Sequence, residues 1–169
     1  MVIRQLTADD VTIFYPFRLR SLREAPHAFT NSYEEYSRQS LDSVSQRFRQ
    51  QAAGDIDFTL GAFEDNQLIG IVGFYRESAL KVRHKGYIVS MYVQPEDRRR
   101  GIARALLLAA LERIRRLPDL DHVLLAVMET QAAAKRLYES LSFTVYGREP
   151  RAVRIGDEYF DEEFMILKL

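Results

Sequence analysis

Residues 91–103 constrain the fold more than any other part of this 169-residue chain. They comprise an apolar run that ends at Pro95, a short basic loop, and the start of a long apolar helix at Gly101. A helix that begins after such a loop leaves the N–H groups of its first turn unpaired, and its dipole adds positive charge there. Gly101 and Ala103 carry no large side chain that would block this helix end. The stretch therefore predicts a strand–loop–helix unit that binds a phosphate-bearing ligand.

Two common phosphate-binding loops do not fit this stretch. A Walker A loop needs G-K-[ST], and a dinucleotide fingerprint needs G-x-G-x-x-G, and neither spacing is present. The 24 basic residues are balanced by 24 acidic ones, whereas a protein that binds nucleic acid normally has a basic excess. We therefore expect no nucleic-acid partner.

The composition fits a single domain over residues 1–169, and 47% of the residues are apolar. The absence of cysteine excludes disulfides and cysteine-based metal sites, and the three histidines lack H-E-x-x-H spacing, so no metal is expected. The N-terminus has no signal-peptide pattern, and the longest apolar run, 105–111, is too short to span a membrane. These features predict a cytoplasmic protein without a membrane partner.

The first half of the chain predicts strands at 2–6, 58–63, 68–75 and 87–93. Thr7 is the expected N-cap of a helix that runs to about Arg23. A second helix is expected over 34–53, with or without a break near Ser40, and Gly54-Asp55 would end it. Residues 64–67 predict a hairpin turn.

The helix after Gly101 has apolar residues at helical spacing and ends near Leu117-Pro118. Residues 122–128 are continuously apolar, which is typical of a strand covered on both faces. A helix over 132–141 and strands at 143–146 and 163–167 complete the chain, and 148–161 is a polar segment with a turn at 155–157. This order of elements predicts an α/β (by some schemes α+β) domain of three layers.

Two motifs resemble those of the GNAT superfamily of N-acetyltransferases. Arg98-x-x-Gly101-x-Ala103 is similar to the Q/R-x-x-G-x-G/A signature of that family. Residues 127–143 contain V-x3-Q-x2-A-x2-L-Y-x3-S-F, which resembles the second signature, although the family has Asn in place of Gln131 and Gly in place of Ser142. The resemblance covers the whole chain and implies the GNAT fold, a mixed sheet of about seven strands with about four helices.

The resemblance implies acetyl-CoA as donor and CoA as product. In the family the first loop holds the pyrophosphate and the second motif contacts the rest of the cofactor. The expected cofactor contacts in this chain are Met91, Tyr92, Val93, Arg98, Arg99, Arg100, Gly101, Ile102, Ala103, Arg104, Gln131, Lys135 and Tyr138. Ser142 stands where the family glycine has left-handed geometry, so we expect a strain of about 1 kcal/mol there.

Two catalytic roles follow from the resemblance. The Tyr138 hydroxyl would protonate the leaving thiolate, and the alternative is that Tyr138 is only a packing residue. The backbone N–H of Met91, where the family strand separates from its neighbour, would polarise the thioester carbonyl. No general base is evident, because Tyr87 stands where several relatives have Glu and Ser90 is too weakly basic. Glu129, Glu34 and Glu35 are weak candidates, and the alternative is a water chain that carries the amine proton.

The acceptor site of the family is built by the first two helices and the last hairpin. The aromatic and acidic residues of these segments, together with Tyr87 of the strand at 87–93, would suit a cationic amine, or the aromatic ones would simply close the core: Phe29, Tyr33, Glu34, Glu35, Tyr87 and Tyr159. We expect acetyl transfer to a primary amine of a small molecule, by direct attack in a ternary complex. A protein N-terminal or lysine acetyltransferase and a non-catalytic CoA-binding module are the alternatives. Exposed edge strands near the C-terminus would allow a homodimer.

Overall fold

The computed structural model describes residues 1–54 and 56–169, and its strands form one seven-stranded sheet in the order β1-β2-β3-β4-β5-β7-β6. The strands are β1 (Val2–Gln5), β2 (Phe58–Glu64), β3 (Gln67–Arg76), β4 (Lys85–Val93), β5 (His122–Met128), β6 (Thr144–Ile155) and β7 (Glu158–Lys168). The pairing of β4 with β5 is parallel, and the other neighbouring strands are antiparallel. The expected mixed sheet of seven strands is confirmed.

In the described residues, five α-helices and three short 3-10 helices surround the sheet. The α-helices are α1 (Val11–Glu24), α2 (Tyr33–Tyr36), α3 (Leu41–Gly54), α4 (Ile102–Ile114) and α5 (Ala132–Glu139), and the 3-10 helices are η1 (Ala8–Asp10), η2 (Pro26–Ala28) and η3 (Pro95–Asp97). The helix expected over 34–53 is divided into α2 and α3 by a break at residues 37–40, so there is one α-helix more than expected. Asp55, the second residue of the expected helix end, lies outside the described residues.

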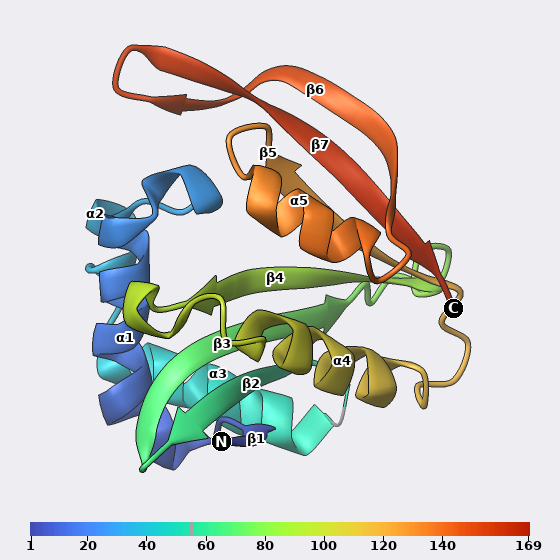
Figure 1. Cartoon of the computed structure of the whole chain (residues 1–169). Helices are drawn as coiled ribbons and strands as arrows, with labels where there is room; N and C mark the ends of the chain where they lie inside the picture. The colour runs from blue at the N-terminus through green and yellow to red at the C-terminus, as the bar shows by residue number, and fades with distance from the viewer. Residues whose placement is uncertain (55) are drawn as a thin grey trace.

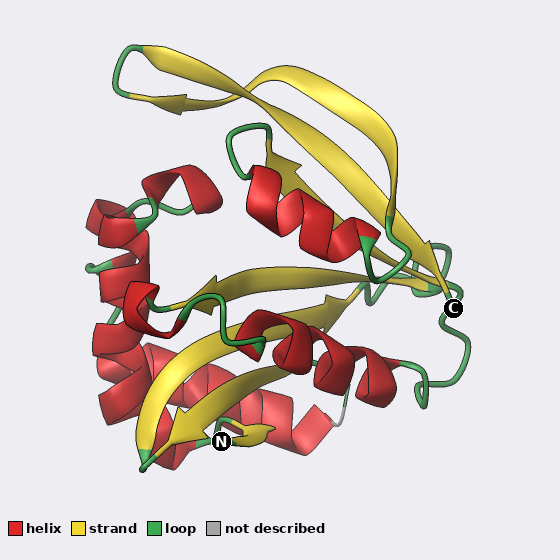
Figure 2. Ribbon diagram, in the orientation of Figure 1, coloured by secondary structure: helices red, strands yellow, loops and turns green. Residues whose placement is uncertain are grey.

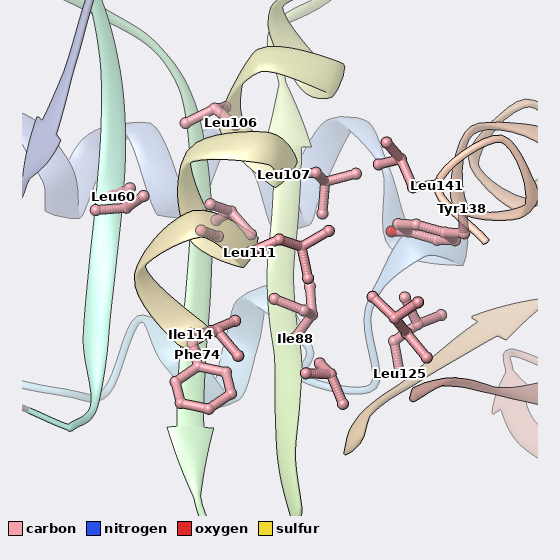
Figure 3. Close-up of a cluster of buried hydrophobic side chains, with 14 of the residues drawn as sticks. Leu60, Phe74, Ile88, Leu106, Leu107, Leu111, Ile114, Leu125, Tyr138 and Leu141 are labelled. Carbon is pink, nitrogen blue, oxygen red and sulfur yellow. The ribbon is translucent and has the colours of Figure 1, made fainter. Parts of the chain in front are cut away.

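The helices form two layers, with α4 and α5 on one face of the sheet and α1 and α3 on the other (Figure 1, Figure 2). On the first face, buried leucines of α4 pack against Ile88 and Phe74 of the central strands (Figure 3). On the second face, Phe14 of α1 meets Phe48 of α3 edge to face at 4.9 Å. Each layer therefore has its own apolar core, and β3 and β4 lie between the two.

Strand β4 separates from β5 toward its C-terminal end and is bulged against β3. It pairs with β5 only over three residues, from Lys85 opposite His122 to Tyr87 opposite Leu124. Its pairing with β3 is interrupted by a bulge. Val89 pairs with Gly73 and Tyr92 pairs with Ile71, so two residues of β4 lie opposite one residue of β3. Ser90 lies in this bulge with a φ of 56°. The sheet therefore opens at the centre of the molecule, as the family resemblance implied.

The polar segment at 148–161 differs from the sequence expectation. It was expected as a polar stretch around a turn, and the structure instead continues β6 and β7 through it as a long hairpin. The turn itself is confirmed, with Gly156 at a φ of 61°. Most side chains of the hairpin are partly or fully exposed, because its distal part extends beyond the helical layers (Figure 1). Strands without a buried face have no apolar alternation, so the sequence pattern could not reveal them.

Candidate active site

A cleft of about 720 Å³ opens where β4 and β5 separate. It is bounded by the end of β4, the loop that enters α4, the end of β5, and α5, with residues 24–28 closing one side. Eleven of the thirteen expected cofactor residues line this cleft, and Arg100 and Lys135 are the two that do not. The two sequence motifs, which are separated by more than twenty residues, therefore form one continuous site.

The loop that enters α4 has the geometry of an anion site. Arg99 and Gly101 have positive φ angles of 63° and 79°. The Ala105 N–H donates to the Gly101 carbonyl at 3.0 Å, and within the described chain the N–H groups of 99–104 donate no hydrogen bond. A Cβ built on Gly101 would meet no atom within 4 Å, so this glycine is required by its φ angle and keeps space open above the helix end.

The basic side chains around the loop have different environments. Arg100 contacts Glu64 at 2.8 Å and also pairs with Asp97, and Lys135 contacts Glu163 at 2.7 Å. These two cations therefore brace the fold beside the cleft rather than line it. Arg99 is exposed and has no ion-pair partner among the residues that the structure describes.

Arg98 of the motif, and Arg104 directly after it, hold the walls of the cleft together. The Arg98 Nε donates to the Val93 carbonyl at 3.0 Å and so joins the loop to β4. The Arg104 Nη1 donates to the Ser140 hydroxyl at 2.8 Å, which links α4 to the end of α5. The shape of the cleft is therefore fixed partly by residues that also line it.

Tyr138 is 7% exposed and lies on the wall of the cleft, where it packs with Leu141 and Leu107 in the first core (Figure 3). Its hydroxyl has no hydrogen-bond partner among the described residues. Burial raises the pKa of Tyr138 to about 12, so the hydroxyl remains protonated at neutral pH. The protonated hydroxyl therefore belongs to a residue that lines the cleft.

The end of α5 shows the strain expected from the sequence. Ser142 has a φ of 70°, in the left-handed region that the family fills with glycine. The Phe143 N–H closes the turn by donating to the Tyr138 carbonyl at 3.1 Å. The geometry of the family is therefore kept here with a residue that is less suited to it.

A polar network that the sequence did not reveal fixes α1 to β4. The Tyr92 hydroxyl donates to Glu24 at 2.7 Å, and burial together with this carboxylate raises the pKa of Tyr92. Arg20 bridges Glu24 at 2.7 Å and Glu96 at 2.5 Å. Glu24 and Tyr92 are 68 residues apart, and neither belongs to a spacing pattern that would connect them. The network positions one wall of the cleft.

A second cavity of about 510 Å³ lies on the α1 and α3 side of the sheet. Strands β2 to β4 form its floor, and it reaches Val89 and Ser90 on β4. The cleft begins at the next residue of the same strand, Met91. The two cavities therefore reach consecutive residues of β4 at the bulge, one from each helical layer.

The residues expected to bind the acceptor are not gathered in this second cavity. Its lining, over the described residues, includes none of the following: Phe29, Tyr33, Glu34, Glu35, Tyr87 and Tyr159. Tyr87 stacks on Tyr75 at 4.9 Å, Glu35 caps its own helix, and Tyr159 lies against Arg151 near the end of the distal hairpin. Phe29 is buried against Tyr92, and the ring of Tyr33 lies under Arg23. Glu34 is exposed.

A model of the acetyltransferase (GNAT) family matches residues 19–143. The chain belongs to this family. The expected family, and with it the class of acetyltransferases, is confirmed.

Curated relatives match part of the chain. A mycothiol acetyltransferase of Thermobispora bispora is 49% identical over 59 residues, which cover 35% of this chain and 20% of that protein. An L-methionine sulfoximine/L-methionine sulfone acetyltransferase of Salmonella typhimurium is 39% identical over 82 residues, which cover 47% of this chain and 46% of that protein. The chain thus spans less than half the length of each of these relatives.

Solved structures match nearly the whole chain. A GNAT-family acetyltransferase of Streptococcus pneumoniae has a TM-score of 0.92 at 23% identity, with 99% of this chain and 98% of that chain covered. The putative acetyltransferase YncA of Salmonella typhimurium, solved with its cofactor acetyl-CoA, has a TM-score of 0.86 at 22% identity, with 100% and 94% covered. These neighbours confirm the GNAT fold, and the acetyl-CoA in the second agrees with the expected donor.

Proposed function

We propose that this GNAT protein transfers the acetyl group of acetyl-CoA to the primary amine of a small molecule, by direct attack in a ternary complex. The observation that carries the proposal is that two cavities reach β4 at consecutive residues, Ser90 and Met91. The donor would therefore bind on the α4 and α5 face of the sheet and the acceptor on the α1 and α3 face. The two would meet at the bulge, where β4 has no partner on the β5 side.

The donor would occupy the cleft. The unpaired N–H groups of residues 99–104 would bind the pyrophosphate, with Arg99 adding charge. The pantetheine arm would follow residues 91–93, which lack a β5 partner. The Met91 N–H would then donate to the thioester oxygen and stabilise the negative charge that develops on it during attack.

The chemical step needs one proton removed and one supplied. The acceptor amine attacks the thioester carbon in its neutral form, and water would take the proton that the nitrogen loses once the C–N bond has formed, because no base is assigned among the lining residues. The C–S bond then breaks, and the Tyr138 hydroxyl would protonate the departing thiolate. Its raised pKa keeps this proton on Tyr138 until the thiolate forms.

A small acceptor is supported by the shape of the site and by one relative. The second cavity is a pocket of about 510 Å³ under α1 and α3, which is the size of a small-molecule site. The Salmonella typhimurium relative is named for L-methionine sulfoximine and L-methionine sulfone, which are small molecules with an amine. A protein acetyltransferase would instead need an open groove for a peptide.

Calorimetric titration with acetyl-CoA and then CoA, followed by a thiol-release assay over a panel of amines, tests the proposal. We expect saturable micromolar binding and acetylation of at least one small amine. Binding without turnover on any amine or peptide would favour a non-catalytic CoA-binding module. Turnover on peptides alone would favour a protein acetyltransferase, and absence of binding would refute the proposal.

We further propose a homodimer formed through β6, which is an edge strand of the sheet. Val145 and Tyr146 of β6 are exposed, with 43% and 57% of their surface accessible. Light scattering coupled to size-exclusion chromatography tests this, and a mass of one chain at all concentrations would refute it.

Among the described residues, no helix is long and apolar enough to cross a membrane.

A further inference from the structure

The guanidinium of Arg18 is buried without a counter-charge. Arg18 lies on α1 and is 3% exposed. Its side chain donates one hydrogen bond, from Nη1 to the Ser21 hydroxyl at 3.3 Å, and no carboxylate in the described part of the chain is within ion-pair distance. Burial lowers the pKa of Arg18 to about 10, so the side chain is still charged at neutral pH. A buried and unpaired charge is costly, which calls for a reason to keep it.

The surroundings of Arg18 favour a cation but do not satisfy its donors. The guanidinium lies 4.2 Å from the ring centroid of Phe29 and 5.7 Å from that of Tyr36. A guanidinium has five N–H donors in a planar fork, and aromatic faces accept none of them as a carboxylate would. A second cation, Arg47, lies nearby and donates to the Tyr36 hydroxyl at 3.1 Å. Most of the guanidinium donors therefore have no acceptor among the described residues.

Arg18 and Arg47 both line the second cavity, the one that reaches Ser90. The acidic residues of that lining are Asp57 and Glu77, and neither forms an ion pair with these arginines. Asp57 instead accepts the backbone N–H of Arg76 at 2.9 Å. The positive charge of Arg18 thus faces a cavity that ends at the proposed point of acetyl transfer.

A chain of contacts ties Arg18 to that point. The Phe29 ring under its guanidinium is 6.3 Å from the ring of Tyr92, which follows the bulge on β4. Phe17, the neighbour of Arg18 on α1, meets the same tyrosine edge to face at 5.5 Å. Arg18 and Ser90 also line the same cavity, so a molecule anchored on Arg18 would share that cavity with the bulge.

We propose that the acceptor carries a carboxylate, that Arg18 binds this carboxylate inside the second cavity with Arg47 beside it, and that the acceptor is an amino acid whose amine faces Ser90 and Met91. This inference rests on the proposed function, since it names the substrate class of the same site. It also makes Arg18 a substrate-binding residue that no sequence motif identified.

The test compares the common amino acids with their carboxamides, which keep the amine and remove the negative charge. Acetylation is measured by thiol release, and binding is measured independently as the shift in unfolding temperature in the presence of CoA. We expect amino acids, and not their amides, to be acetylated and to raise the unfolding temperature.

Three variants separate binding from folding. Arg18→Met keeps the length of the side chain without its charge, and Arg18→Lys keeps the charge without the fork. Arg49→Met is the matched control, because Arg49 is exposed on α3 and does not line the cavity. For Arg18→Met we expect the KM of the amino acid to rise about 10- to 100-fold with little change in kcat, which is the loss expected for a charge-assisted hydrogen bond. The KM of Arg18→Lys should lie between those of the wild type and Arg18→Met, and Arg49→Met should have the KM of the wild type.

The outcomes distinguish this inference from the proposed function. Equal acetylation of acids and amides, or an unchanged KM in Arg18→Met, would overturn the carboxylate site while the acetyltransferase stands. Binding of amino acids that depends on Arg18, without any acetylation, would support the site and refute the transferase. An absence of both binding and acetylation of amino acids would overturn the inference.

Discussion

The two cavities that reach β4 are built in different ways. The cleft on the α4 and α5 side takes its lining largely from two short stretches, 91–104 and 126–138, and its anion site is made of backbone N–H groups. The cavity on the α1 and α3 side is assembled from side chains of α1, α3 and three strands. The first is a local feature of the chain, whereas the second exists only after folding. A cofactor common to a family suits the first kind of site, and an acceptor specific to one protein suits the second.

The largest effect is expected in the cleft, for Tyr138→Phe. Removal of the proton donor should lower kcat about 100-fold or more, while the affinity for acetyl-CoA stays nearly constant. The hydroxyl has no protein partner among the described residues, so the fold should tolerate the change. Stopped assays of acetyl transfer and calorimetry measure the two quantities. An unchanged kcat in Tyr138→Phe would show that Tyr138 only packs.

Gly101→Val tests whether backbone N–H groups form the anion site of the cleft. The φ of 79° strains any β-branched residue, and the new side chain would fill the space above the helix end. We expect the affinity for acetyl-CoA to fall about 10- to 100-fold by calorimetry. Gly156→Val is a matched control, because Gly156 has a φ of 61° and open space around it, but lies outside the lining of the cleft. Equal losses in both variants would mean that strain alone, and not the anion site, explains the effect.

The pH profile separates the two proton transfers. Ionisation of Tyr138, with its pKa raised to about 12, would remove the proton donor only at strongly alkaline pH. We therefore expect kcat/KM to rise with pH as the acceptor amine becomes neutral, with no decline from Tyr138 below about pH 10. A decline that begins near pH 8 and disappears in Tyr138→Phe would contradict the environment assigned to this residue.

Arg18→Met also tests whether the buried charge of Arg18 stabilises the folded protein. If Arg18 is kept for a ligand, removal of its unpaired charge should leave the free energy of unfolding unchanged or raise it by about 1 kcal/mol. Urea denaturation in the absence of ligands measures this, with Arg49→Met for comparison. A loss of about 2 kcal/mol or more would indicate that the packing of Arg18 on Phe29 and Tyr36 is structural.

The smallest effect concerns Ser142, at the end of α5. Ser142→Gly should relieve the strain of a φ of 70° and raise the free energy of unfolding by about 0.5–1 kcal/mol, since part of the gain is offset by the freedom of glycine in the unfolded chain. Thermal unfolding measures the change. A decrease in stability would show that the Ser142 side chain makes a compensating contribution.

Much of the fold could be predicted because its signals are local. The apolar run at 122–128 has the bounds of β5, and the periodic residues after Gly101 predict α4. The loop geometry could be predicted too, since glycine at 101 and a helix start identify it. The distal hairpin could not, because its strands are largely exposed and lack apolar alternation. Arg18 gave no signal either, as a charged residue on an amphipathic helix normally faces water, and only tertiary packing buries it.

The account is tested most directly by the amide chemical shifts of isotope-labelled protein, titrated first with acetyl-CoA and then with an amino acid that is acetylated. It predicts that acetyl-CoA shifts the amides of 91–93 and 99–104, that the amino acid shifts residues around Arg18 and Val89, and that the two sets meet at Ser90 and Met91. If neither ligand changes the amides of Ser90 and Met91, or if both ligands shift the same set, the claim that donor and acceptor meet at the β4 bulge from opposite layers would be contradicted.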